Sequence, residues 1–165
     1  MIELIVLDVD GTLTDGKITY SNSGDEIKSF DVADGLAVAV WTKKFGKKAA
    51  IITGRNSLIV EKRAKELGIT YLYQGIKNKQ EVLENILEKE NISWSQVAAI
   101  GDDLNDYNML KKAGLSFTPA NGTHYLKEFV NVVCKNKGGD GAVREMLEYI
   151  IKEDGLEEEF LNAWL

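Results

Sequence analysis

The sequence predicts an α/β protein with a mostly parallel central sheet that helices cover on both sides. Short apolar runs alternate along the chain with segments whose apolar residues recur every three or four positions. Such runs are typical of buried parallel strands, and the longer spacing is typical of amphipathic helices. Several predicted strands also end in polar residues, and ligands bind at the carboxyl ends of strands in such sheets. The alternation therefore predicts a layered sheet with a functional site at one edge.

Length, composition and charge exclude several classes of protein. The chain has 165 residues, 44% hydrophobic and 28% charged, which predicts one globular domain over residues 1–165. Its apolar runs are far shorter than the ~20 residues of a membrane span, so we expect no membrane partner. A net charge of −6 argues against a nucleic-acid partner, which would need clustered Lys and Arg. Cys134 is the only cysteine, and no basic leader precedes the first strand. Both observations favour a cytoplasmic location.

The first strand is expected over Leu4–Leu7, and it ends in Asp8-Val9-Asp10-Gly11-Thr12. Two carboxylates one residue apart at a strand end are suited to hold a hard cation, to attack an electrophile or to divide acid and base roles. The alternative is an ordinary solvated turn, because Asp and Gly both favour turns. The residues that follow decide between these interpretations.

A β-hairpin is expected over about residues 17–30. Residues 17–20 and 26–30 read as strands, and the turn sequence Ser21-Asn22-Ser23-Gly24-Asp25 separates them. Two isolated strands are only marginally stable in water. We therefore expect the hairpin to contact another subunit, and a free flap is the alternative.

The remaining elements follow in alternating order. One helix is indicated by Val60, Ala64 and Leu67, which share a face, and Gly68 is expected to end it. Apolar pairs four apart within residues 82–87 indicate a second helix. The further strands are expected at residues 48–52, 70–73, 97–100, 115–117 and 131–134.

Three of these strand ends carry groups suited to a phosphate or a metal. Thr53-Gly54-Arg55 follows one strand, and a hydroxyl beside glycine at a helix start suits an oxyanion. Lys79 offers a compact positive charge for phosphate. The acids of Gly101-Asp102-Asp103-Leu104-Asn105-Asp106 would complete a hard-metal site if they converge on Asp8. The alternatives are that Thr53, Asp102 or Asp103 only cap helices, and that Lys79 is a solvated charge on a helix.

The order of these motifs resembles that of the haloacid dehalogenase-like hydrolase superfamily over nearly the whole chain. Asp8-Val9-Asp10-Gly11-Thr12 resembles its first motif, Thr53 its second, Lys79 its third and Gly101-Asp102-Asp103 its fourth. The resemblance implies a Rossmann-like three-layer fold with a β-hairpin flap after the first strand. Many relatives insert a cap domain there or after the second motif, and this chain leaves no room for one.

The resemblance also assigns roles to the motif residues. It implies that Asp8 attacks phosphorus to form an aspartyl-phosphate, and that Asp10 protonates the leaving oxygen and later deprotonates water. It implies Mg²⁺, with Mn²⁺ or Co²⁺ as substitutes, bound by the Asp8 and Asp102 carboxylates and the Asp10 carbonyl. The residues implied to bind phosphate are Thr53, Gly54 and Lys79, and those implied to support the site are Asp103 and Asp106.

Finer features resemble the 3-deoxy-D-manno-octulosonate 8-phosphate phosphatase family. They lie in residues 8–16, 30–35, 53–63, 101–106 and 138–145. The resemblance implies a small-molecule sugar-acid phosphate as substrate and a place in lipopolysaccharide synthesis. It also implies a homotetramer, joined through the hairpin and a C-terminal segment of about residues 141–165.

Substrate-binding residues are expected around the phosphate site. Arg55 and Arg63 lie eight apart, about two helical turns, so we expect both on the same side of a helix. The alternative makes Arg63 a surface charge between glutamates. Where some relatives carry a basic residue, residues 36–40 are apolar, and Arg144 is a candidate to replace it, unless it pairs with Glu148. The full expected set is Asp31, Val32, Ala33, Asp34, Gly35, Arg55, Arg63, Asn105 and Arg144.

The C-terminal residues form an apolar stripe. Leu156, Phe160 and Trp164 share one helical face, opposite the acidic residues 157–159. Such a stripe packs on something, and the rest of the chain offers little further core. We therefore expect it to pack on another subunit.

Two other functions compete with this interpretation. A phosphatase for a 9-phosphorylated nonulosonate would share every core motif, and only Arg55, Ser57 and Arg63 bear on the difference. A non-enzymatic phosphoacceptor receiver domain also uses Asp, Thr, Lys and Mg²⁺. Receivers, however, carry the phosphorylated Asp on a later strand and lack an acid equivalent to Asp10, so the sequence favours the enzyme.

Overall fold

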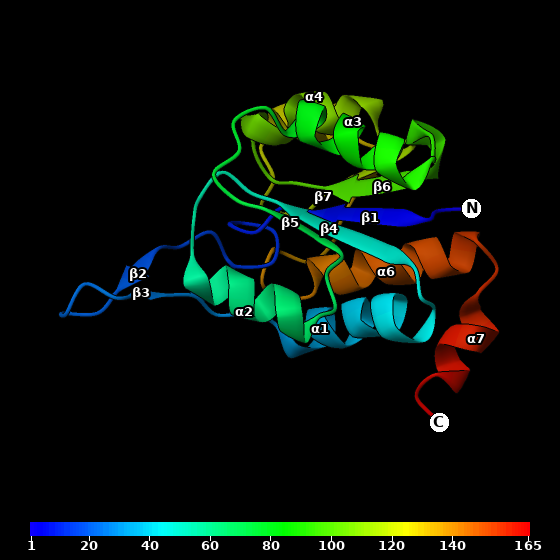
Figure 1. The fold of residues 1–165 in the computed structure, drawn as a ribbon, viewed down its shortest axis with the longest axis horizontal. Helices are drawn as coiled ribbons and strands as arrows, with labels where there is room; N and C mark the ends of the chain where they lie inside the picture. Colours follow the sequence, from blue (N-terminus) through cyan, green and yellow to red (C-terminus); the bar gives the residue numbers. More distant parts are fainter.

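The computed structural model describes residues 1–165 and confirms the predicted α/β fold (Figure 1). Six strands form one sheet in the order β5-β4-β1-β6-β7-β8, and each neighbouring pair is parallel. The strands are β1 (Leu4–Leu7), β4 (Lys48–Ile52), β5 (Tyr71–Tyr73), β6 (Val97–Ile100), β7 (Leu115–Thr118) and β8 (Val132–Val133). The central strands β1 and β6 are buried along their whole length, as fully apolar runs require in a sheet covered on both faces.

Predicted and observed strand ends agree at the centre of the sheet and differ toward its edges. The bounds of β1, β4 and β6 are those expected. The β5 strand begins at Tyr71 instead of Thr70, β7 extends to Thr118, and β8 is only Val132–Val133. The edge strands β5 and β8 each have one neighbour in the sheet, so fewer hydrogen bonds define their ends, and β7 lies next to β8.

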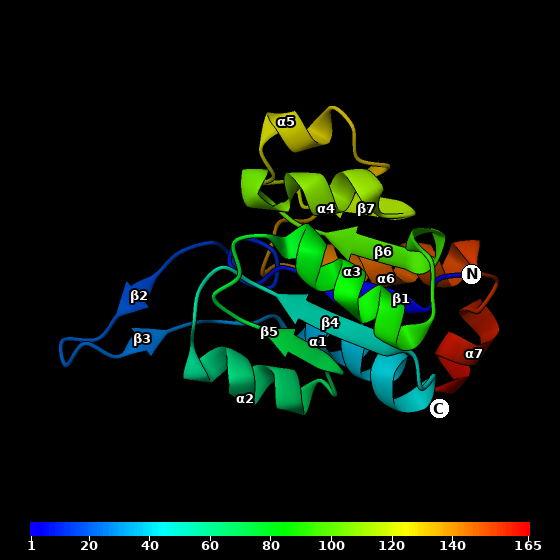
Figure 2. The ribbon, with the colours of Figure 1, turned by 45° about the horizontal axis from the view of Figure 1, so that its top comes forward.

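Helices cover both faces of the sheet (Figures 1 and 2). Val60, Ala64 and Leu67 are buried in one core cluster, as predicted, and Leu83, Ile86 and Leu87 are buried in the other. Val82, expected on the second apolar face, is only partly buried. One layer contains α1 (Val32–Ala39), α2 (Leu58–Glu66), α6 (Ala142–Glu153) and α7 (Glu157–Asn162), and the other contains α3 (Lys79–Glu90), α4 (Tyr107–Lys112) and α5 (His124–Lys127).

The segment between β1 and α1 holds a hairpin and no inserted domain. Strands β2 (Thr19–Tyr20) and β3 (Glu26–Ile27) pair antiparallel in a sheet of their own, shorter than the predicted residues 17–20 and 26–30. The hairpin projects away from the central sheet in both views (Figures 1 and 2). The expected absence of a cap domain is thus confirmed. None of the helices combines the length and the apolar character that spanning a membrane would take.

The strand register brings the candidate motifs to one edge of the sheet. Leu7 lies opposite Ile51 in β4 and opposite Ile100 in β6. The residues that follow these strands, which include Asp8, Thr53 and Gly101, therefore leave the sheet side by side. Because parallel strands share one carboxyl edge, motifs some 50 and 90 residues apart meet there.

Candidate active site

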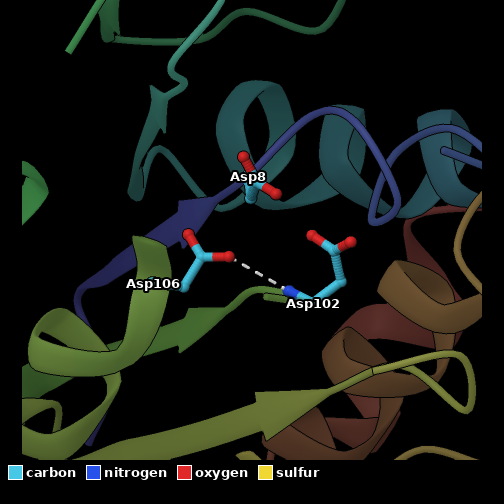
Figure 3. A group of neighbouring side chains, drawn as sticks. All are labelled: Asp8, Asp102 and Asp106. Atoms are coloured by element: carbon cyan, nitrogen blue, oxygen red, sulfur yellow. Dashed lines mark hydrogen bonds between the residues drawn. The ribbon is translucent and has the colours of Figure 1, made fainter. Parts of the chain in front are cut away.

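Three carboxylates meet at the carboxyl edge of the sheet. Asp8 follows β1, and Asp102 and Asp106 follow β6 (Figure 3). Their nearest oxygens all lie within 4.8 Å of one another. Asp8 is 4% exposed and Asp106 is fully buried. Of the acids in Gly101–Asp106, Asp102 and Asp106 converge on Asp8 as predicted, whereas Asp103 is exposed and lies outside the group.

Lys79 lies between two of these acids. It is the first residue of α3, and its Nζ donates to Asp8 Oδ1 at 2.8 Å and to Asp106 Oδ1 at 2.7 Å. The residue is 2% exposed, so the alternative of a solvated helix charge is wrong. An ammonium is expensive to bury unless carboxylates compensate it, and here two do.

Burial and crowding perturb the ionisation of the site. Burial raises the pKa of Asp8 to about 7, although the charge of Lys79 opposes the shift. Burial, with the nearby charge of Asp8, raises the pKa of Asp106 to about 7. Burial also raises the pKa of Asp102. Burial by itself would lower the pKa of Lys79. The charges and hydrogen bonds of Asp8 and Asp106 outweigh burial, so the pKa of the ammonium is raised. One cation faces three acids, so the site suits a further positive charge.

The donor set fits a divalent hard cation. Carboxylate oxygens are the ligands that Mg²⁺ prefers, with water and phosphate completing its octahedron. Asp8 and Asp102 were expected to bind the metal, and they belong to the cluster. Asp106 was expected only to support the site. It does so by accepting from the Asp102 and Asp103 backbone N–H groups at 3.1 and 3.4 Å.

The loop after β1 is held close to Asp102 by contacts that the sequence did not reveal. Gly11 has φ +88°, and a Cβ added there would lie 2.0 Å from Asp102 Oδ2, so only glycine fits. Asn121 Nδ2 donates to the Gly11 carbonyl at 2.9 Å, and Asn121 Oδ1 accepts from Gly138 N at 2.7 Å. Asn121 thereby joins three loops. No local pattern marks it, because its partner in the first loop is 110 residues away.

The Asp10 carboxylate lies outside the acid group and contacts the hairpin. Its Oδ1 accepts from Lys28 Nζ at 2.5 Å, and the same ammonium donates to Glu26 Oε1 at 2.9 Å. Lys28 follows β3 at the base of the hairpin, and its side chain has no exposed surface. Neither Lys28 nor Glu26 was predicted. A charged residue in a predicted flap gives no signal in the sequence that its side chain turns inward.

The predicted phosphate loop ends β4 beside the second acidic loop. Thr53 is 2% exposed. A Cβ added at Gly54 would lie 3.9 Å from Asn105 Nδ2, so the exposed Asn105 side chain flanks this loop. Asp103 caps the short helix Leu104–Asp106 by accepting from Leu104 N at 2.7 Å. The capping alternative is therefore correct for Asp103, and its supporting role in the site stays a prediction.

Arg55 and Arg63 do not share a helix, so the argument from their spacing is wrong. The α2 helix begins at Leu58, after its N-cap Ser57, and Arg55 precedes it. Arg55 is half-exposed and pairs with Glu26 of the hairpin at 3.3 Å. Arg63 lies in α2, where it pairs with Glu66 at 3.3 Å, as the surface-charge alternative anticipated, and also donates to the Asp31 carbonyl.

Residues 31–35 form the start of α1, and some of their polar groups take part in its capping and packing contacts. Asp31 caps the helix by accepting from Asp34 N at 3.0 Å. Asp34 is 1% exposed, and its Oδ1 accepts from Arg144 N at 2.9 Å. Gly35 faces Arg63, because a Cβ there would lie 2.2 Å from Arg63 Nη2. Within this segment Val32 is 74% exposed and Ala33 is half-buried.

Arg144 lies at the start of α6, beside α1. Its Nε donates to Glu148 at 2.6 Å, which is the pair that the sequence left open. Its Nη1 also donates to the Ala33 carbonyl at 3.4 Å. Its contribution to substrate binding stays a prediction.

Known proteins resemble this chain over most of its length. A family model described as haloacid dehalogenase-like hydrolase matches residues 72–146. The 3-deoxy-D-manno-octulosonate 8-phosphate phosphatase of Escherichia coli is 42% identical over 155 residues, which are 93% of this chain and 81% of that protein.

Solved structures agree with these similarities. A crystal structure of the 3-deoxy-D-manno-octulosonate 8-phosphate phosphatase from Moraxella catarrhalis holds a magnesium ion, a phosphate ion and a KDO molecule. It matches with a TM-score of 0.94 at 40% identity, over 99% of this chain and 94% of that chain. The cobalt-bound deoxy-D-mannose-octulosonate 8-phosphate phosphatase from Haemophilus influenzae matches with a TM-score of 0.88 at 35% identity, over 93% of this chain and 90% of that chain.

Proposed function

We propose that this chain, which belongs to the haloacid dehalogenase-like hydrolases and among them to the 3-deoxy-D-manno-octulosonate 8-phosphate phosphatases, hydrolyses that sugar-acid phosphate to 3-deoxy-D-manno-octulosonate (KDO) and inorganic phosphate. The observation that carries the proposal is the group of Asp8, Asp102 and Asp106, with Lys79 between Asp8 and Asp106, in a chain of this family. The enzyme is a metal-dependent phosphomonoester hydrolase, and related structures hold magnesium or cobalt.

The carboxylates of Asp8 and Asp102, with the Asp10 carbonyl, would hold Mg²⁺. When bound, the ion offsets negative charge on the phosphate and on the acid cluster. Within the protein, Lys79 already supplies one positive charge 2.8 Å from Asp8 Oδ1. A phosphate that approaches Asp8 is therefore not repelled by an uncompensated carboxylate.

We assign the chemical steps to Asp8 and Asp10. An Asp8 oxygen attacks phosphorus, and the bond to the sugar oxygen breaks to leave an aspartyl-phosphate. Asp10 gives its proton to the leaving oxygen, then takes a proton from the water that cleaves the aspartyl-phosphate. The Thr53 hydroxyl, the Gly54 backbone and the Lys79 ammonium hold the phosphoryl oxygens as their charge rises.

The substrate's carboxylate and hydroxyls need partners at the mouth of the site. Arg55, half-exposed beside the hairpin, and Asn105, exposed beside Gly54, are suited to this role. We also retain Arg63, Arg144 and residues 31–35 as candidates, among which Val32 is the most exposed. An arginine guanidinium matches a carboxylate in a bidentate geometry, which suits a sugar acid.

We further propose that the enzyme is a cytoplasmic homotetramer joined through the hairpin and the C-terminal segment. Tyr20 and Ile27 on the hairpin are 61% and 47% exposed, and Leu161 in α7 is 62% exposed. Apolar side chains exposed together on a projecting element favour a protein contact. Cys134 is free and buried, consistent with a reducing compartment.

Phosphate release from purified sugar-acid phosphates tests the function. We expect multiple turnover of KDO 8-phosphate with Mg²⁺, loss of turnover with a chelator, and a fall of roughly 10⁴-fold or more in kcat for Asp8→Asn. A higher kcat/KM for a 9-phosphorylated nonulosonate would reassign the substrate. A single phosphorylation of the protein without turnover would contradict the enzyme and favour a receiver.

A further inference from the structure

We propose that Lys28 is a positioning residue for the Asp10 carboxylate and ties it to the hairpin. The inference rests on the proposed function, in which Asp10 transfers the protons. It concerns a residue that none of the motifs contains, and it makes the hairpin part of the catalytic apparatus.

The position of Lys28 is unusual for a lysine. Lysine side chains are almost never fully buried unless they are paired. The Lys28 side chain has no exposed surface, and its Nζ contacts Asp10 Oδ1 at 2.5 Å and Glu26 Oε1 at 2.9 Å. Two carboxylates thus share one shielded ammonium at the base of the hairpin.

Asp10 depends on this contact. Its carboxylate is not part of the group formed by Asp8, Asp102 and Asp106. The bond from Lys28 is the one hydrogen bond that this carboxylate accepts from the protein. Asp10 lies in a loop beyond the end of β1, so the strand itself does not fix its side chain.

Further ion pairs connect Lys28 through Glu26 of the hairpin to Arg55, which follows Gly54 of the predicted phosphate loop. Glu26, the second partner of Lys28, also pairs with Arg55 at 3.3 Å. Arg55 in turn donates to the Tyr20 hydroxyl at 3.5 Å. The charges alternate from Asp10 through Lys28 and Glu26 to Arg55. Without Lys28, no cation would lie between the Asp10 and Glu26 carboxylates, and their negative charges would repel each other.

A positioning role predicts a specific kinetic effect. A general acid must lie within hydrogen-bond reach of the leaving oxygen, and a displacement of about 1 Å costs about 100-fold in rate. Loss of Lys28 should therefore lower kcat and leave KM nearly unchanged. The effect should also depend on whether the leaving group needs a proton.

The experiment compares Lys28→Met, Lys28→Arg and Lys17→Met in the full-length enzyme with Mg²⁺. Lys17→Met is the matched control, because Lys17 is an exposed lysine near the start of the same hairpin. Steady-state kinetics use KDO 8-phosphate, whose sugar alkoxide needs a proton to leave. Rapid mixing uses p-nitrophenyl phosphate, whose nitrophenolate leaves without one.

We expect Lys28→Met to lower kcat on KDO 8-phosphate about 10- to 100-fold, with KM changed less than about twofold. With p-nitrophenyl phosphate it should release one nitrophenolate per site at the wild-type rate. Later turnovers should be slow, because hydrolysis of the aspartyl-phosphate needs Asp10 as the base that deprotonates water. Lys28→Arg should keep most of the activity, and Lys17→Met all of it.

The inference fails if Lys28→Met has the wild-type kcat, if it slows the first and later turnovers equally, or if a folded Lys28→Arg loses as much. If Lys28→Met does not fold, Lys28→Gln replaces it with the same expectations, since its shorter, neutral side chain removes the cation between Asp10 and Glu26. A failure of the proposed function is distinct, because then the wild-type enzyme would not hydrolyse KDO 8-phosphate.

Discussion

At the scale of single residues, Lys79 and the three acids show how burial sets the charges of the site. Lys79 is shared by Asp8 and Asp106, whereas Asp102 has no lysine partner. Burial holds the pKa of Asp8 and of Asp106 at about 7. A cation bound beside these groups would favour their ionised form, because an opposite charge lowers the pKa of a carboxyl group. The site thus contains one permanent positive charge, the Lys79 ammonium, and a group of carboxylates suited to bind an exchangeable metal ion.

Metal binding should stabilise the folded protein. A cation that binds only the folded state adds about 2.7 kcal/mol when present at 100 times its Kd. We expect the melting temperature to rise with Mg²⁺ in the wild type and to rise much less in Asp102→Asn, which lacks one cluster carboxylate. Asp15→Asn, an exposed acid outside the cluster, is the control. An equal rise in Asp102→Asn would remove Asp102 from the metal site.

Asp34 should make stability depend on pH. Burial raises its pKa from 3.8 to about 6, so the folded state binds the proton more tightly than the unfolded state. Its contribution is fully present below about pH 4 and is lost as pH rises through about 6. Asp34→Asn should remove that slope, so its stability relative to wild type should increase by up to about 3 kcal/mol between pH 4 and 7.

Urea unfolding at several pH values measures this effect. Asp25→Asn, at an exposed position in the hairpin turn, should follow the wild-type curve. An unchanged slope in Asp34→Asn would show that Asp34 ionises normally in the folded protein.

At the scale of elements, the C-terminal helix differs from its prediction. Phe160 is 7% exposed and belongs to the same core cluster as the α6 residues. It stacks edge-on with Trp164, and the Arg144 guanidinium lies over both rings at 5.8 and 5.5 Å. The expectation that the rest of the chain offers little further core for this stripe is therefore wrong for Phe160. The exposed side of α7 remains a candidate for a subunit contact.

Truncation of Phe160 should destabilise the chain itself. A buried Phe→Ala change costs about 3–5 kcal/mol, and partial burial at the end of the chain places Phe160→Ala near the lower value. Trp164→Ala should cost less, since Trp164 is 40% exposed. Denaturant unfolding of both variants tests this. If only the association state changed in Phe160→Ala, the side chain would pack on a neighbour.

At the scale of the whole molecule, no cap domain covers the site. The hairpin projects from the central sheet (Figure 2), and at its base Lys28 contacts Asp10 of the first acidic loop. Without a cap domain, a neighbouring chain seated over the site would exclude water from it. Assembly through the hairpin would thus serve catalysis as well as stability.

Charges placed on the hairpin should disrupt the assembly. The double change Tyr20→Lys with Ile27→Lys puts two cations on side chains that are 61% and 47% exposed. We expect light scattering to show fewer than four chains per particle and kcat to fall about tenfold or more, since the site would lose its cover. Tyr125→Lys, 50% exposed on α5, is the control. A wild-type mass in the double variant would exclude the hairpin interface.

The fold class, the central strands and the motif acids could all be predicted from the order of residues along the chain. Leu4–Leu7, Lys48–Ile52 and Val97–Ile100 have the predicted bounds because a strand buried on both faces is a local apolar run. Asp8 and Asp102 meet because parallel strands share one carboxyl edge. Both inferences depend only on residues near in sequence and on a general rule of sheets.

The buried charges and the contacts between distant side chains became visible only in the folded molecule. Lys28 binds Asp10 across 18 residues, and Asn121 binds the Gly11 carbonyl across 110. Phe160 packs into a core whose size cannot be judged from the sequence pattern. Such contacts follow from the packing of elements distant in the chain, and periodicity and spacing describe only one element at a time.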